Sequence, residues 1–195
     1  MRRTMTLLVT ISAAGLALFV LLYLITGNGF CKTMMITFGT TFYHFAVRLL
    51  AGGVINAFYH KRPDYTKKWF SELSFEKKLY RKLGVKLWKD KMPTYNPEVF
   101  SLENHSVEEL IMATCQSELV HTANVVLSFV PVIVAAFLGI SPLLVFILTS
   151  LAGAAFDLIF VIMQRYNRPR LIRLMNRQKK VKYKHSAPVR SSREL

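Results

Sequence analysis

Leu143–Met163, LLVFILTSLAGAAFDLIFVIM, is the stretch that decides the fold of this chain. Its single ionisable residue is Asp157, and as a helix the stretch rises about 30 Å, which matches the hydrocarbon core of a bilayer. Gln164–Leu171, QRYNRPRL, follows without a break and holds three arginines, two amides and a tyrosine. The sequence therefore predicts a transmembrane helix that leaves the bilayer through a dense polar motif.

Three other apolar stretches predict further spans. Leu7–Ile25 contains no charged residue, and Val125–Ile140 is joined to Leu143–Met163 by turn residues at Gly139–Pro142. Met34–Tyr59 contains His44 and Arg48 but is long and otherwise apolar. We expect an all-α integral membrane protein with four transmembrane helices, at about residues 7–25, 34–59, 119–140 and 143–163.

The first apolar stretch has two possible roles. Because Arg2 and Arg3 precede it, it fits a secretory signal peptide as well as a span. Its core is longer than the apolar region of a usual signal peptide, and no clear small-x-small cleavage site follows. We therefore expect a retained helix.

Positive charge is unevenly placed along the chain, which has 26 Lys and Arg against 11 Asp and Glu. In the four-span arrangement, every Lys and Arg except Lys32 and Arg48 falls on one side of the membrane. The positive-inside rule makes that side the cytoplasm, so residues 60–118 and both termini are expected there. No nucleic-acid motif accompanies the charge, and Cys31 and Cys115 are too few for a disulfide framework or a zinc site.

The cytoplasmic residues 60–118 form an amphipathic segment in which aromatic residues alternate with Lys and Arg. Leu79, Leu83 and Leu87 recur every four residues, which predicts an interfacial helix. Ser106-Val107-Glu108-Glu109 reads as a capping box that begins a helix running into the third span. We expect residues 1–177 to form one membrane domain and residues 178–195 a basic, disordered tail.

A stripe of polar residues lies on one sector of the third predicted helix: Thr114, Ser117, Glu118, His121, Asn124 and Ser128. Polar residues inside a span are costly, so they point to a site. Glu118 and His121, three residues apart, suit a histidine general base held by a carboxylate. The alternative is a polar seam between helices with no chemistry. A Glu-x-x-His pair also occurs in di-iron bundles, but those need a second such motif, so we expect no metal.

The second helix and Asp157 supply further candidates. His44 and Arg48 are one turn apart, and a buried Asp157 needs a partner, for which Arg48 is the obvious choice. This ion pair can be structural or catalytic. His44 remains open as a second base, a substrate donor or a packing residue, and Asn56 is a weaker candidate of the same kind.

Arginine binds phosphate and carboxylate through paired hydrogen bonds, so the motif at Gln164–Leu171 suits an anionic or lipid-linked substrate. The alternative is a positive-inside anchor, and Arg168-Pro169 predicts a bend. The expected substrate-binding residues are Arg48, Asn124, Asp157, Gln164, Arg165, Tyr166, Asn167, Arg168 and Arg170.

Glu118-Leu119-Val120-His121, followed after two apolar stretches by the Gln164–Leu171 motif, resembles the glycosyl-4,4'-diaponeurosporenoate acyltransferases. These are small bacterial integral membrane proteins of staphyloxanthin biosynthesis. The similarity extends weakly upstream through Phe75-Glu76-Lys77 and Trp88-Lys89. The resemblance implies transfer of a fatty acyl group to a sugar hydroxyl of a membrane-embedded glycolipid. His44-x-x-x-Arg48 and Asp157 go beyond the family pattern, which leaves an acceptor other than a carotenoid glycoside open.

These features combine into one hypothesis, an acyltransferase of the bacterial cytoplasmic membrane. His121 deprotonates the acceptor hydroxyl and Glu118 orients the imidazole, while the arginines bind an acyl-CoA or an acyl carrier protein. No bound cofactor is expected, and the partners are membrane lipids, a lipid-linked acceptor and the acyl donor. The rival hypothesis is a non-enzymatic lipid-binding protein or a subunit of a larger membrane complex. Transport is less favoured, since no repeat or broken helix pair is evident.

Overall fold

The computed structural model describes residues 2–59, 62–92 and 103–186, and all regular secondary structure among them is helical. The α-helices are α1 (Arg2–Thr26), α2 (Gly29–Tyr59), α3 (Glu76–Lys82), α4 (Val85–Trp88), α5 (Val107–Leu127), α6 (Val130–Phe137) and α7 (Leu143–Ser186). Two short 3₁₀ turns, η1 (Lys68–Phe70) and η2 (Lys89–Lys91), flank the small helices. The prediction of an all-α fold is confirmed.

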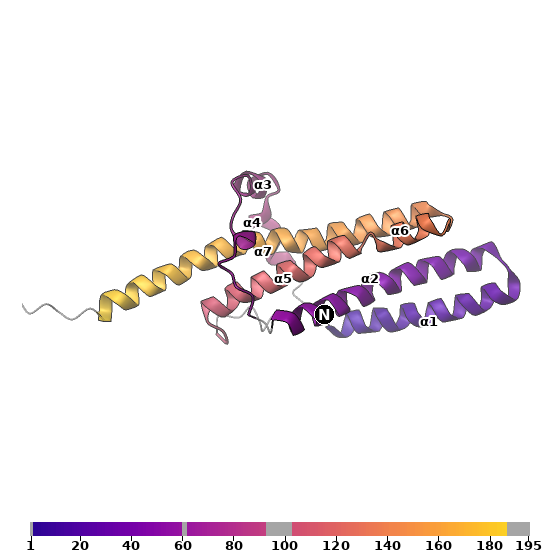
Figure 1. Ribbon diagram of the computed structural model, residues 1–195, viewed down its shortest axis with the longest axis horizontal. Coiled ribbons are helices and arrows are strands. Elements are labelled where there is room, and N and C mark those ends of the chain that lie inside the picture. Colours follow the sequence, from indigo (N-terminus) through magenta and orange to yellow (C-terminus); the bar gives the residue numbers. More distant parts are fainter. Residues whose placement is uncertain (1, 60–61, 93–102, 187–195) are drawn as a thin grey trace, which may run out of the picture.

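Two antiparallel hairpins lie side by side, with their turns at the same end of the molecule (Figure 1). The first joins α1 to α2 through Gly27, whose φ is +61°, and the second joins α6 to α7 after Gly139, whose φ is +63°. Only glycine adopts this backbone region without cost. A close approach also holds the first hairpin, because a Cβ on Gly15 would lie 2.4 Å from the Phe38 ring.

Three stretches are long and apolar enough to cross a membrane: Arg3–Thr26, Val107–Phe137 and Leu143–Tyr183. They indicate a membrane protein. Side chains such as Leu24 (74% exposed) and Ile25 (81% exposed) on α1 have no protein to pack against in the chain alone, as expected of a lipid-facing helix. Among the described helices α2 is not one of the three, since Lys32, His44, Arg48 and four threonines lower its mean hydropathy.

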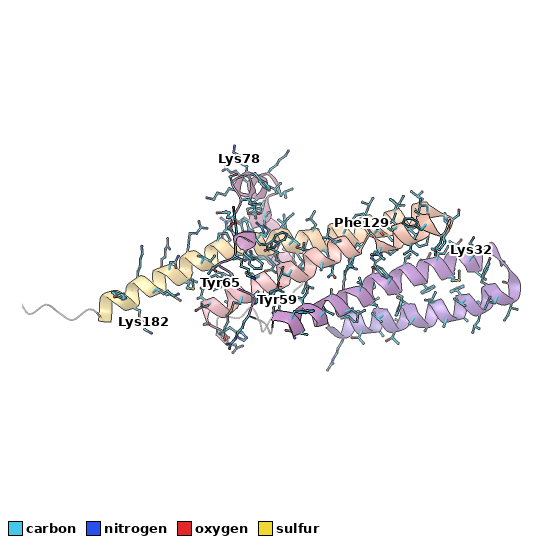
Figure 2. All side chains as sticks on the ribbon, viewed as in Figure 1. Lys32, Tyr59, Tyr65, Lys78, Phe129 and Lys182 are labelled. Atoms are coloured by element: carbon cyan, nitrogen blue, oxygen red, sulfur yellow. The ribbon has the colours of Figure 1, made fainter. Side chains whose placement is uncertain are left out.

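The loop between the hairpins differs from the predicted interfacial helix. The helical turns stop at Lys82 and restart at Val85, because Gly84 takes a left-handed conformation with φ +58°. The result is two short helices in place of one, with Lys78 on α3 pointing away from the bundle (Figure 2). The predicted capping box is confirmed, since Ser106 Oγ accepts from the Glu109 amide and Glu109 reaches back to the Ser106 amide.

The long helix α7 runs through Pro169 and ends at Ser186. Leu171 and Met175, just after the proline, pack on Val107 and Ile111 of α5, and this contact supports the helix beyond the lost hydrogen bond. The tail that was expected to begin at residue 178 is therefore helical as far as residue 186. Its remainder, residues 187–195, lies outside the described part of the chain.

Candidate functional site

The polar stripe of α5 faces the other helices, not lipid. Thr114, Glu118, Asn124 and Ser128 are each at most 2% exposed. They lie along the interface with α7, and α2 of the first hairpin closes the seam. Since buried polar groups require partners, the partner of each side chain decides whether the seam is one site or two.

Asp157 of α7 is the centre of the deeper part of the seam. Its side chain is fully buried, and its Oδ1 lies 2.8 Å from His121 Nδ1 while its Oδ2 accepts from Arg48 Nη2 at 2.6 Å. Asn124 Nδ2 adds a longer contact of 3.4 Å to Oδ1. The predicted pair of Arg48 and Asp157 is confirmed. Three helices thus converge on one carboxylate.

The partners of His121 fix which ring nitrogen carries the proton. A carboxylate paired with arginine is an acceptor only, so His121 Nδ1–H must donate to Asp157. Among the described residues, no group is hydrogen bonded to Nε2. The ring stacks on Phe160 with centroids 4.7 Å apart, and the side chain keeps 22% exposure. His121 therefore presents a free Nε2 lone pair, which is the arrangement of a general base.

Arg48 ties α2 to α7 beyond its ion pair. Its Nη2 also donates to the Gly153 carbonyl at 3.0 Å, and its Nη1 donates to the carbonyl of His44 one turn earlier. His44 is 7% exposed, and neither ring nitrogen has a partner among the described residues. The structure brings His44 to the same seam, but among the described residues nothing forms a hydrogen bond with its imidazole ring. His44 therefore remains the weaker of the two candidate bases.

Gly153 leaves room for this junction, and a side chain there should loosen it. A Cβ at Gly153 would lie 3.2 Å from Arg48 Nη2, 3.3 Å from His44 Nδ1 and 3.4 Å from Ser128 Oγ. We expect Gly153→Ala to lower the free energy of unfolding by about 1–3 kcal/mol through overpacking, measured by thermal unfolding in detergent. The control is Gly53→Ala, where the new Cβ meets nothing within 4 Å. Equal melting of the two variants would contradict a tight junction.

The expected pairing of Glu118 with His121 is not formed. Glu118 is 1% exposed, and its two oxygens are taken by arginines of α7: Oε1 accepts from Arg165 Nη1 at 2.6 Å, and Oε2 binds Arg168 Nη2. In the antiparallel pair α5–α7, His121 lies opposite Asp157 and Glu118 lies opposite the helix exit. The carboxylate at the histidine is therefore Asp157.

The two arginines hold a loop against the helices. Arg165 donates to the carbonyls of Trp69 and Ser71 and to Glu76 Oε1, and Arg168 donates to the Phe70 carbonyl. Arg168 also donates to Thr114, both to its Oγ1 and to its carbonyl, at 3.2 Å each. Every guanidinium nitrogen of both residues thus has a partner in the protein. Both guanidinium groups are thus bound to the protein itself, and their expected role as substrate ligands stays a prediction.

The remaining residues of the Gln164–Leu171 motif lie around this arginine cluster. Tyr166 is buried and packs edge-on against Tyr80, with centroids 5.4 Å apart. Arg170 is exposed and its guanidinium lies 3.5 Å from the centroid of the Tyr166 ring. Gln164 is buried and Asn167 half-buried. Asn56, the weaker candidate, accepts from Gln116 at 3.1 Å and links α2 to α5.

Two members of the seam were not anticipated from the sequence. Glu76 is only 4% exposed although it comes from a strongly charged loop, and its other oxygen accepts from the Leu73 amide at 3.2 Å. Burial and the nearby Glu76 carboxylate raise the pKa of Tyr80 far above its usual value, so this phenol stays neutral. Phe160 is the second residue that was not anticipated, because the sequence shows only that it is apolar and not that it stacks on His121.

The site thus has two parts about 12 Å apart along α7, at 1.5 Å per residue between Asp157 and Arg165. The deeper part, made of His121, Asp157, Arg48 and Asn124, offers a base. The shallower part, made of Glu118, Arg165, Arg168 and Glu76, is a charge-balanced clamp on the loop. Only the first has a group free to take up a proton.

Comparison with known proteins identifies the family of the chain. A family model described as glycosyl-4,4'-diaponeurosporenoate acyltransferase matches residues 66–177. Neither the curated proteins nor the solved structures yield a significant match. The matched stretch includes the clamp and both His121 and Asp157, whereas His44 and Arg48 precede it. Since the match covers more than half of the chain, the protein belongs to the glycosyl-4,4'-diaponeurosporenoate acyltransferase family.

Proposed function

We propose that this protein transfers a fatty acyl group from an acyl thioester to a hydroxyl of a membrane glycolipid. The observation that carries the proposal is the His121–Asp157 pair, with His121 Nε2 free and Nδ1 held by a buried carboxylate. Acyl transfer to an alcohol needs a base that takes the hydroxyl proton as the new bond forms, and a histidine oriented in this way supplies it. The acyltransferase family of the chain supports the same reaction class.

In the proposed reaction the C–S bond of the thioester breaks and the C–O bond of the new ester forms. His121 Nε2 takes the proton of the acceptor hydroxyl while the oxygen attacks the thioester carbonyl. The tetrahedral adduct then expels the thiolate, which recovers the proton from the imidazolium. Asp157 stabilises the charge on His121 during the step, and the ion pair with Arg48 holds the Asp157 carboxylate in position. No oxidant or metal enters the balance.

The acceptor and the donor are proposed from the chemistry of the site. Gln164 and Asn167 follow about two and three turns beyond Asp157 on α7, where an amide suits the hydroxyls of a sugar. Arg170, exposed at the same end, suits an anionic group of the donor. We propose a glycolipid acceptor, either a carotenoid glycoside or another lipid-linked sugar, and an acyl-CoA or an acyl carrier protein as donor. No bound cofactor takes part.

We propose that all four long helices cross the bacterial cytoplasmic membrane and that both termini and the loop of α3 and α4 are cytoplasmic. Two features support this arrangement. The α1–α2 hairpin has its turn at the same end as the α6–α7 hairpin (Figure 1), and Lys32 lies at that end, far from Lys182 (Figure 2). The positive-inside rule then makes the opposite, lysine-rich end cytoplasmic.

Replacing Asp157 with asparagine tests the proposal, because it exchanges one carboxylate oxygen for an amide nitrogen and leaves the size of the side chain nearly unchanged. We expect Asp157→Asn to lower the rate of acyl transfer about 100-fold, because an amide that donates to Nδ1 places the histidine proton on Nε2. The measurement is transfer of a labelled acyl group from acyl-CoA or acyl carrier protein to a bacterial glycolipid extract, with the protein in nanodiscs. The control is Asp64→Asn in the exposed loop, which should transfer as wild type does.

Two outcomes would count against the proposal. If the wild-type protein transfers no label with either donor, the enzyme assignment fails and a lipid-binding role takes its place. If Asp157→Asn folds normally and transfers label at the wild-type rate, the His121–Asp157 pair is not the catalytic base.

A further inference from the structure

The C-terminal part of α7 leaves the bundle as a separate rod. At 1.5 Å per residue its 44 residues extend about 66 Å, roughly twice the hydrocarbon thickness of a bilayer. Met175 is its last buried residue, and residues 176–183 are all exposed. Figure 1 shows the yellow end of α7 running away from every other helix. Beyond Met175, the described part of this helix therefore presents its side chains to solvent.

The charge on this rod is of one sign. Six Lys and Arg lie between Arg173 and Lys184, and no Asp or Glu occurs between Asp157 and Glu194. Arg173, Arg177 and Lys180 are exposed and spaced at i, i+4 and i+7, so they form one stripe along the helix. Like charges at this spacing repel and weaken a helix. An acidic partner along this stripe, called here the Arg173 stripe, would remove that repulsion.

The position of the stripe favours a soluble partner over the membrane. Arg177 lies 13 residues beyond Gln164, which places it about 20 Å past the apolar stretch along the helix axis. The potential of an anionic lipid surface decays over about 8 Å at physiological ionic strength. On a rod that continues the direction of the span, Arg177 and Lys180 therefore lie beyond the range of the lipid headgroups, and only Arg173, about 14 Å past the apolar stretch, lies close to them.

The form of the stripe also favours a protein over a small anion. The three cations lie in a row over about 10 Å of the helix. The hollow beside them, lined by Arg177, Gln178, Val181 and Lys182, is wide open and mostly apolar, so it would not enclose the phosphates of a nucleotide. The three cations match a row of carboxylates on a second helix, which is how charge complementarity selects and orients a protein partner. Val181 (58% exposed) and Tyr183 (81% exposed) add apolar surface between the charges.

We propose that the Arg173 stripe docks a small acidic acyl-carrier protein that presents its acyl thioester to His121. This inference rests on the proposed function and narrows its donor to one class. The stripe begins 16 residues beyond Asp157 on the same helix, about 24 Å along its axis. The flexible thiol-bearing arm of a carrier covers this gap, while the rigid helix between dock and base sets its direction.

A binding measurement tests the docking by itself. Full-length protein in nanodiscs of uncharged lipid is titrated with a purified bacterial acyl carrier protein. We expect Arg177→Glu/Lys180→Glu to raise the Kd about tenfold or more, and added salt to weaken the wild-type complex. The matched control is Lys78→Glu/Lys82→Glu, which makes the same charge change on exposed α3 and should leave the Kd unchanged.

Activity separates this inference from the proposed function. With acyl carrier protein as donor, the stripe variant should show a raised KM, whereas with acyl-CoA it should match wild type. If the stripe variant loses carrier binding while the wild-type protein transfers no acyl group from any donor, that combination would support the docking proposal and contradict the proposed enzymatic function. Equal carrier binding by wild type and the stripe variant would overturn the dock. If the wild-type protein binds anionic vesicles but not the carrier protein, and the stripe variant does not bind the vesicles, the stripe binds a lipid surface and the docking proposal is wrong.

Discussion

Replacing His121 with glutamine is expected to lower the rate of acyl transfer about 1,000-fold, within the range that a positioned general base contributes. Glutamine keeps a polar side chain that can still contact Asp157 but offers no nitrogen of suitable basicity. Since His121 lies at the seam with 22% of its side chain exposed, the substitution should leave the helix packing intact. The loss should appear in kcat with each donor, because the base acts after either thioester has bound.

Two other histidines serve as controls for this variant. His105→Gln changes an exposed loop residue near Glu109 and should transfer label at the wild-type rate. His44→Gln tests the alternative base on α2, and we expect a smaller loss than for His121→Gln because His44 has no carboxylate to orient it. A variant at His121 that is folded and fully active would remove it from the mechanism, and a larger loss at His44 would transfer the role to α2.

Replacing Glu118 with alanine should have the largest effect on stability. The change leaves Arg165 and Arg168 without the carboxylate that both contact. Removing one member of a buried ion pair typically costs about 3–5 kcal/mol, because the remaining charge stays desolvated. The free energy of unfolding, measured by thermal melting or denaturant titration in mixed micelles, should fall by about that amount.

The same variant should also release the loop that the arginines clamp. Trypsin should cleave after Lys77 or Arg81 faster in Glu118→Ala than in wild type, since the carbonyls of residues 69–71 lose their fixed donors. The control is Glu108→Ala on the same helix, where the side chain is exposed and accepts a hydrogen bond from Tyr65. If Glu118→Ala melts together with Glu108→Ala, the cluster is not a stabilising clamp.

The fold was largely predictable because apolar stretches and their interruptions carry most of the information for a membrane chain. The stretch at Leu143–Met163, the turn at Gly139–Pro142 and the cap at Ser106 all lie where the sequence placed them. The division of the loop at Gly84 could not be predicted, since a leucine repeat of four residues gives no sign of a left-handed residue within it. The continuation through Pro169 depended on packing between α5 and α7, which a local pattern does not report.

Most members of the site were predicted, and so was the pair of Arg48 and Asp157, but the carboxylate that binds His121 was not. His121, Asp157, Glu118 and the arginines were all singled out, yet Glu118 was assigned to His121 from their spacing on one helix. Interhelical contacts override that spacing here. Residues at similar distances from the turn at Gly139–Pro142 lie opposite each other to within about one helical turn. His121 is 18 residues before Gly139 and its partner Asp157 is 15 residues after Pro142, whereas Glu118 and its partner Arg165 are 21 before and 23 after. This register was available in the sequence and is the signal that would have found the pairing.

The burial of the arginines was beyond the reach of sequence reasoning. Arg165 and Arg168 have the chemistry of anion ligands, and their partners are backbone carbonyls of residues 69–71 and the distant Glu76. Every residue has a backbone carbonyl, so the residue types do not show which carbonyls accept these hydrogen bonds. A basic motif at a helix exit therefore reads as a binding site until the structure shows what occupies its donors.

A double-mutant cycle on the rate of acyl transfer tests the central claim most directly. Wild type, His121→Gln, Asp157→Asn and the double variant are compared in the same nanodiscs with the same acyl donor and glycolipid. Because Asp157 is proposed to act only through the imidazole that it holds, the double variant should be no slower than His121→Gln alone, as for residues that act as one unit. If the fold loss in rate of the double variant equals the product of the two single fold losses, the two residues act independently. The proposal of a His121–Asp157 base would then be wrong.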